Sequence, residues 1–270
     1  MSLSTSPAVR HLVPGAAAGL VAFAFSRVMI EPLIGVAIDY EGVRAHAEAE
    51  LVGGDHDHSH ELFTRAVQED VGAAVGIVGF GIVMGVLFAV AYAVIRGVLD
   101  RRGYHPDPAG LALVLAAGMF VAVALMPSLK YPANPPGVGL EETVAERSSS
   151  YLTITVLSVV AACAAVAVGL TLARQGVWRA AAVAVGGYVA VMLCAMTVLP
   201  TFDEVPGPLA GPDGIVLDGF PAAVLADFRL FSLINQAVLW LVVGAAFAWL
   251  TVQERSSASR SQSALSAAAS

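Results

Sequence analysis

The chain has 270 residues, of which 57% are apolar and only 13% are charged, and its formal net charge is −7. Soluble globular domains carry about a quarter charged residues, so this composition excludes a water-soluble domain and favours a membrane protein. The acidic balance argues against nucleic acid as a partner, because nucleic-acid-binding surfaces are basic.

Six segments are long and apolar enough to cross a bilayer, whose hydrocarbon core of about 30 Å requires about 20 helical residues. In chain order they cover residues 12–30, 71–95, 109–129, 151–173, 180–200 and 230–252. Only helices and closed barrels satisfy the backbone in lipid, and the sequence lacks the short alternating strands of a barrel. We predict an all-α integral membrane protein with long outer loops. We expect about six transmembrane helices, packed as a polytopic bundle. Residues 1–252 then form a single transmembrane domain.

Basic residues set the orientation of this bundle, because positively charged loops stay on the cytoplasmic side. An amino terminus placed inside puts only three acidic residues on that side, together with eight arginines: Arg10, Arg96, Arg101, Arg102, Arg174, Arg179, Arg255 and Arg260. The other 18 acidic residues then lie outside, where they attract cations. We therefore predict that both termini are cytoplasmic and that residues 253–270, rich in Ser and Ala, form a disordered cytoplasmic tail.

The three predicted outer connections, residues 31–70, 130–150 and 201–227, resemble one another. Each begins with a proline at or near the end of a helix: Pro32, Pro127 and Pro200. Each then leads to an arginine shortly before the next span: Arg65, Arg147 and Arg229. This pattern predicts three related helical hairpins. The alternative is that each helix end acquired these residues independently, since proline and arginine are common there.

The first outer connection contains the sharpest chemical signal, a run of imidazoles and carboxylates: Asp55, His56, Asp57, His58 and His60. Imidazole and carboxylate together suit divalent transition metals, and a flexible loop can fold several such groups around one ion. His46, Glu48 and Glu50 upstream are further candidate ligands. The alternative interpretation is a solvated acidic surface loop without a specific ion.

Glu31 is an ionisable residue at the outer edge of the first span, where charges are costly and are usually paired or functional. Arg27 precedes it by four residues, so the two side chains can form an ion pair on one helical face. Alternatively, Glu31 accepts the cation that the His-rich loop releases. We therefore include Glu31 among the candidate metal-binding residues.

Three stretches of the chain resemble the CbtA family of predicted cobalt transporter subunits. They are "LMPSLKYPANPPGVG" at residues 125–139, "EPLI" at residues 31–34 and "FRLFSLINQAVLW" at residues 228–240. The resemblance implies a multi-pass protein of the bacterial inner membrane that supplies cobalt and acts with a small His-bearing membrane partner, CbtB. The family is often described with five spans, whereas this sequence has six.

The leading functional hypothesis is a membrane subunit of a transition-metal uptake system, with cobalt suspected as the ion. The outer His-rich loop would capture the cation, and the helical bundle would conduct it inward. The alternative is a non-transporting scaffold or sensor that binds metal and organises a partner subunit. We expect no enzyme activity and no bound nucleotide, because the sequence has neither a Gly-Lys of a phosphate-binding loop nor a His-Glu-x-x-His zinc motif.

Overall fold

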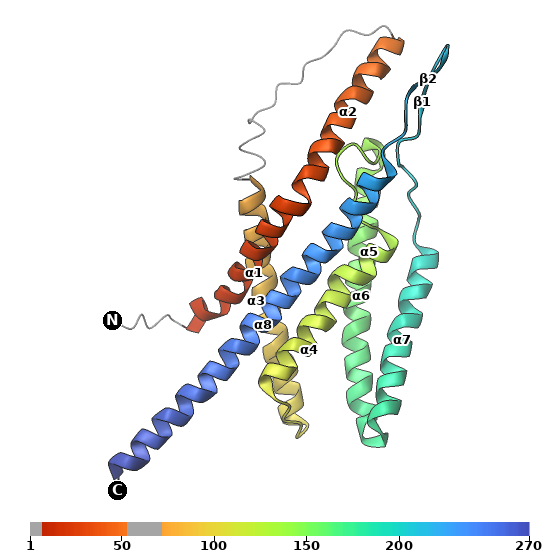
Figure 1. The fold of residues 1–270 in the computed structure, drawn as a ribbon. Coiled ribbons are helices and arrows are strands. Elements are labelled where there is room, and N and C mark those ends of the chain that lie inside the picture. The colour runs from red at the N-terminus through yellow and green to blue at the C-terminus, as the bar shows by residue number, and fades with distance from the viewer. Residues whose placement is uncertain (1–6, 53–71, 270) are drawn as a thin grey trace. The chain divides into compact units, whose positions relative to one another are not determined.

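A computed structural model describes residues 7–52 and 72–269 of the chain (Figure 1). Its helices are α1 (Pro7–Met29), α2 (Glu31–Val52), α3 (Ala73–Arg101), α4 (Pro108–Phe120), α5 (Met126–Lys130), α6 (Val144–Leu172), α7 (Val177–Val198) and α8 (Ala222–Ala269). Shorter elements are a π-helical segment (Val121–Leu125), two 3-10 turns (Glu141–Thr143 and Ala173–Gln175) and strands β1 (Leu209–Gly211) and β2 (Gly214–Leu217).

Six of the described helical stretches are long and apolar enough to cross a membrane. They are Leu12–Met29, Ala73–Arg101, Pro108–Lys130, Glu141–Gln175, Val177–Val198 and Ala222–Ser257. Each coincides with one of the six spans predicted from the sequence. The all-α, multi-pass architecture is therefore confirmed.

The third span is interrupted by a π-helical segment, Val121–Leu125, between α4 and α5. The cause is Pro127, which has no backbone N–H and whose ring clashes with the carbonyl of Val123 four residues earlier. Widening the preceding turn relieves this clash while the chain stays helical.

The first of the three predicted outer connections differs in part from the loop expected over residues 31–70. Its first part, Glu31–Val52, is the helix α2. Pro32 occupies the second position, where a missing N–H costs nothing, and the residues after it include many Ala, Glu and Leu, which favour helix. Metal-ligand candidates in this segment therefore have fixed helical spacing.

The carboxyl-terminal segment also differs from the sequence prediction. A disordered tail was predicted after Gln253, whereas α8 continues to Ala269. Alanine has the highest helix propensity and recurs in this stretch, and the Ser256 and Ser257 hydroxyls donate to the carbonyls four residues earlier.

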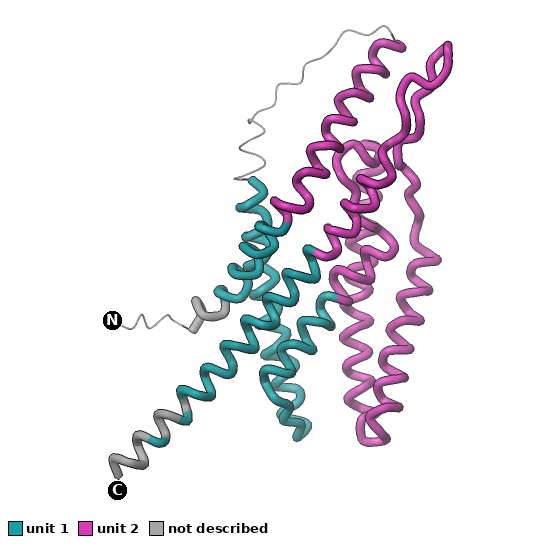
Figure 2. Tube along the Cα trace, in the orientation of Figure 1, with its two compact units in different colours: residues 1–25, 63–120, 235–270 teal, residues 26–62, 121–234 magenta. Residues whose placement is uncertain are grey.

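The chain divides into two compact units (Figure 2). That residues 1–252 form a single transmembrane domain stays a prediction. Unit 1 comprises Met1–Phe25, Phe63–Phe120 and Asn235–Ser270, and unit 2 comprises Ser26–Leu62 and Val121–Ile234.

In unit 1, α1 and α3 approach each other closely through glycines. A Cβ added at Gly81 would lie 2.6 Å from the Cα of Gly19, and one at Gly85 would lie 2.6 Å from the Cα of Gly15. Only residues without side chains allow backbones to approach this closely. The same unit packs α3 against α8, where the Phe88 and Phe247 rings meet edge to face at 5.1 Å.

Unit 2 has two apolar clusters. One joins α6 and α7 through Ile154, Tyr188 and Met192, and the buried Ser158 Oγ and Tyr188 Oη are 2.8 Å apart. The other joins α2, the start of α8 and the Pro-rich segment after α5 (residues 131–140). Its buried residues are Ala37, Val138, Phe220 and Leu225.

Strands β1 and β2 form an antiparallel hairpin in unit 2. Pro212 and Asp213 make its turn, and Gly214 follows with φ of 131°, a value that favours glycine.

Candidate functional site

The predicted metal-binding residues are only partly within the described structure. Asp55, His56, Asp57, His58 and His60 lie outside the described residues. Glu31 and His46 are described, and both belong to α2.

The structure separates Glu31 from His46. Glu31 is the first residue of α2, and His46 follows 15 residues later. At 1.5 Å per residue, the two positions are about 22 Å apart along the helix axis, too far for both to hold one ion. Glu31 is therefore no part of a site centred on His46.

His46 has a nearer carboxylate in Glu50, one turn further along α2. The His46 Nε2 and Glu50 Oε1 atoms are 3.9 Å apart, and the side chains are 62% and 70% exposed. Both residues line a shallow hollow of about 380 Å³. An imidazole and a carboxylate at this spacing provide two candidate ligands. Among the described residues, no group of three His, Cys, Asp or Glu side chains could hold a metal ion.

The opposite face of α2 is anchored to the segment that contains the β hairpin. Arg44 Nη1 donates to the Gly207 carbonyl at 2.8 Å and to the Tyr40 hydroxyl at 3.3 Å, and Arg44 Nε is 2.8 Å from Glu48. The bond to Tyr40 raises the pKa of Arg44, and Glu48 acts in the same direction. Tyr40 in turn donates to the Asp218 carbonyl at 3.2 Å. These contacts fix the rotation of α2, so His46 and Glu50 face away from this segment.

The Pro-rich segment after α5 connects several parts of unit 2. Tyr131 Oη donates to the Pro200 carbonyl at 2.7 Å, and Asn134 Oδ1 accepts from Arg229 Nη2 at 2.8 Å. Gly139 has φ of 119°, and a side chain there would overlap the Arg147 guanidinium. The segment therefore links α5 to the ends of α7 and α8, and glycine is required at its close approach to α6.

Glu204, on the connection after α7, binds this segment through hydrogen bonds and an ion pair. Its Oε2 accepts from the Leu140 N–H and the Thr143 hydroxyl, both at 2.9 Å, and lies 3.4 Å from Arg147 Nε. The Glu204 side chain is only 10% exposed. The Leu140 bond, the Thr143 bond and the Arg147 charge lower the pKa of Glu204, so it is ionised at neutral pH.

Glu204 and Arg44 were not among the residues singled out from the sequence. In the sequence, Arg147 and Arg229 each stand shortly before a span, and their partners lie 57 and 95 residues away in the chain. Spacing in sequence cannot reveal such partners. The Pro-Asp-Gly sequence at residues 212–214 is a local signal that predicts the turn of the hairpin.

A family model described as "Probable cobalt transporter subunit (CbtA)" matches residues 8–252. The chain belongs to the CbtA family. Its six helical stretches that are long and apolar enough to cross a membrane fit this family of probable cobalt transporter subunits, and the match extends into the sixth stretch. Searches of curated proteins and of solved structures gave no match.

Proposed function

We propose that this CbtA protein captures a divalent transition metal, cobalt first among them, on its outer side and passes it inward through the helical bundle. The proposal rests on the cobalt-transporter family and on one structural observation, the exposed His46–Glu50 pair of α2.

The position of this pair supports capture. The last residue of α2, Val52, precedes Asp55 by only three residues, so the two ligands of α2 lie next in the chain to three further imidazoles. A complete site then takes His46 and Glu50 from the helix and the remaining ligands from among Asp55, His56, Asp57, His58 and His60. Neutral imidazoles and carboxylates together form a site suited to cobalt, nickel, copper or zinc.

The membrane potential supplies an inward driving force for such an ion. A divalent cation gains about 4.6 kcal/mol per 100 mV, from about 2.3 kcal/mol for each charge. We propose the bacterial inner membrane as the location, both termini in the cytoplasm, and the small His-bearing CbtB protein as the partner subunit. No catalytic reaction and no nucleotide enter this mechanism.

Metal titration of the full-length protein tests the capture site. His46→Ala and Glu50→Gln should each weaken cobalt affinity by about 10-fold or more, the equivalent of one lost charge-assisted contact. His105→Ala is the matched control, because His105 Nδ1 also lies near a carboxylate, 3.2 Å from Asp100 Oδ1, on the connection between α3 and α4. Equal affinity of all three variants and the wild type would contradict the capture site.

The scaffold or sensor alternative is favoured by one observation. In the spans that the structure describes, no three candidate ligands meet to form an ion site along a transport path. The two functions differ in uptake: a scaffold binds cobalt without accumulating it in sealed vesicles.

A further inference from the structure

Unit 1 contains an open cavity of about 800 Å³ that metal capture does not use. Most of its wall is apolar and comes from α1, α3 and α8, including Leu12, Val86, Val90 and Phe247. Arg96, Glu254 and Arg255 also line it. Its volume lies within the range of about 300–1,000 Å³ found for small-molecule sites.

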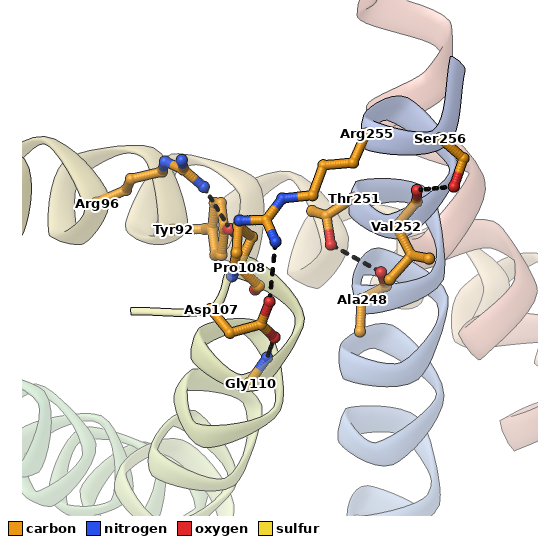
Figure 3. Close-up of polar contacts among 10 residues, drawn as sticks. All are labelled: Tyr92, Arg96, Asp107, Pro108, Gly110, Ala248, Thr251, Val252, Arg255 and Ser256. Atoms are coloured by element: carbon orange, nitrogen blue, oxygen red, sulfur yellow. Dashed lines mark hydrogen bonds and ion pairs between the residues drawn. The ribbon is translucent and has the colours of Figure 1, made fainter. Parts of the chain in front are cut away.

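The polar groups of this cavity gather around one corner (Figure 3). Tyr92 Oη donates to the Pro108 carbonyl at 3.2 Å and accepts from Arg96 Nη1 at 3.3 Å, while Arg255 Nη1 is 3.1 Å from Asp107 Oδ1. Tyr92 is 7% exposed, so this corner is built around a buried hydroxyl. The arginines remain accessible, with side-chain exposures of 45% for Arg96 and 60% for Arg255.

The apolar and charged parts of the wall are separated along the helix axes. Val86 and Val90 precede Arg96 on α3 by ten and six residues, which places them about 15 and 9 Å deeper in the span. Val86 and Val90 are 40% and 57% exposed. The cavity wall is therefore apolar within the span and charged at the predicted cytoplasmic interface. A phospholipid has the same arrangement when its acyl chains point into the membrane and its headgroup lies at the interface.

The charges distinguish between possible occupants. Arg96 Nε lies 3.8 Å from Asp100 Oδ2, and Arg255 Nη1 lies 3.1 Å from Asp107 Oδ1, so this part of the wall carries both signs of charge. A ligand that also carries both signs can pair with the arginines and a carboxylate together, whereas a metal cation would leave the arginines without a counter-charge. The cavity volume could hold less than about two turns of a partner helix, whose diameter is about 10–12 Å, and so short a contact is too small for stable docking. Guanidiniums bind phosphate in a bidentate manner, and the Glu254 carboxylate in the same wall suits an ammonium group.

We propose that this cavity binds an aminophospholipid, with the phosphate on Arg96 and Arg255, the primary ammonium toward Glu254, and an acyl chain along Val86 and Val90. Basic pockets between transmembrane helices are known sites for lipid headgroups. Because this wall contains both arginines and a carboxylate, it favours a headgroup with a negative and a positive charge over one that is only anionic.

Native mass spectrometry of the delipidated, full-length protein tests this with three lipids of equal chain length. Phosphatidylethanolamine should bind more tightly than phosphatidylglycerol, which lacks the ammonium, and than phosphatidylcholine, whose quaternary ammonium has no N–H donor. The double variant Arg96→Gln/Arg255→Gln should lose about 10-fold or more in affinity. Glu254→Gln should remove the preference over phosphatidylglycerol.

The matched control is Arg174→Gln/Arg179→Gln, which removes two exposed arginines from the ends of α6 and α7 and should leave binding unchanged. A photo-crosslinker at Val90 gives a second measurement, and we expect a lipid adduct that excess phosphatidylethanolamine competes away. Equal binding of the three lipids, wild-type affinity in the Arg96/Arg255 variant, or a protein adduct at Val90 would each overturn the proposal.

Discussion

Glu204 shows how a single carboxylate holds two connections of unit 2 together, the one before α6 and the one after α7. It accepts bonds from Leu140 and Thr143 and faces Arg147, while Arg147 Nη2 itself donates to the Leu140 carbonyl at 3.0 Å. The bonds from Leu140 and Thr143 and the ion pair with Arg147 are strengthened by the ionised carboxylate. The strength of these Glu204 contacts therefore depends on pH.

We predict that Glu204→Gln lowers the melting temperature at pH 7. The folded-state pKa of Glu204 is lowered from 4.5, so its stabilising contribution is complete above pH 4.5 and is lost as the pH falls through the lowered folded-state value. The difference in melting temperature between wild type and variant should shrink over that acidic window. A difference that stays constant down to the lowest pH would show that ionisation of Glu204 does not stabilise the fold.

Glu31 is the residue whose role in transport is most open to test. It begins α2, where a negative side chain also interacts favourably with the helix dipole, worth about 0.3–1 kcal/mol. We predict that Glu31→Gln lowers the maximal rate of cobalt uptake several-fold (about 3-fold or more) even at saturating metal, because the charge that attracts the ion at the membrane edge is lost. Unchanged maximal uptake with only a lower melting temperature would assign Glu31 a structural role.

The sequence predicts which side chains can act as metal ligands better than it predicts how far apart they lie in space. His46 and Glu31 were both predicted as metal ligands from their types, yet their distance along α2 follows only once that segment is known to be helical. The segment looked like a loop because it is too polar to span a membrane. Helix propensity and the favourable position of Pro32 decide its structure instead.

At the level of the helices, apolar length identified all six spans because the bilayer imposes one length on every crossing segment. Gly15 and Gly19 are four residues apart, a spacing that allows close helix approach, and both lie against α3. Gly72 and Gly76 have the same spacing, yet nothing lies within 4 Å of a Cβ added at Gly76. Spacing alone therefore cannot tell a packed glycine from one that faces open space.

Gly81 and Gly79 on α3 provide a matched test of helix packing. Gly81→Ala places a methyl group against the backbone of Gly19, and we predict a loss of about 1–3 kcal/mol in unfolding free energy. Gly79→Ala meets nothing within 4 Å and should gain up to about 1 kcal/mol from helix propensity. Equal effects in an SDS-denaturation titration would contradict close packing of α1 on α3.

For the whole molecule, the orientation in the membrane is the first prediction to test. Cys163 and Cys194 are exposed in α6 and α7 and must first be replaced by alanine. A cysteine introduced at Ser59 should then react with an impermeant reagent applied from the periplasmic side, and one at Ser257 should be protected. The reverse pattern would contradict the positive-inside assignment.

Cobalt uptake into sealed vesicles tests transport most directly. Purified protein, reconstituted alone and together with its partner subunit, should accumulate cobalt when the interior is negative, and His46→Ala should reduce uptake mainly at low cobalt concentration. His105→Ala should leave the concentration dependence unchanged. Binding of cobalt to the reconstituted protein without any potential-dependent accumulation, in either preparation, would contradict transport and leave the scaffold function.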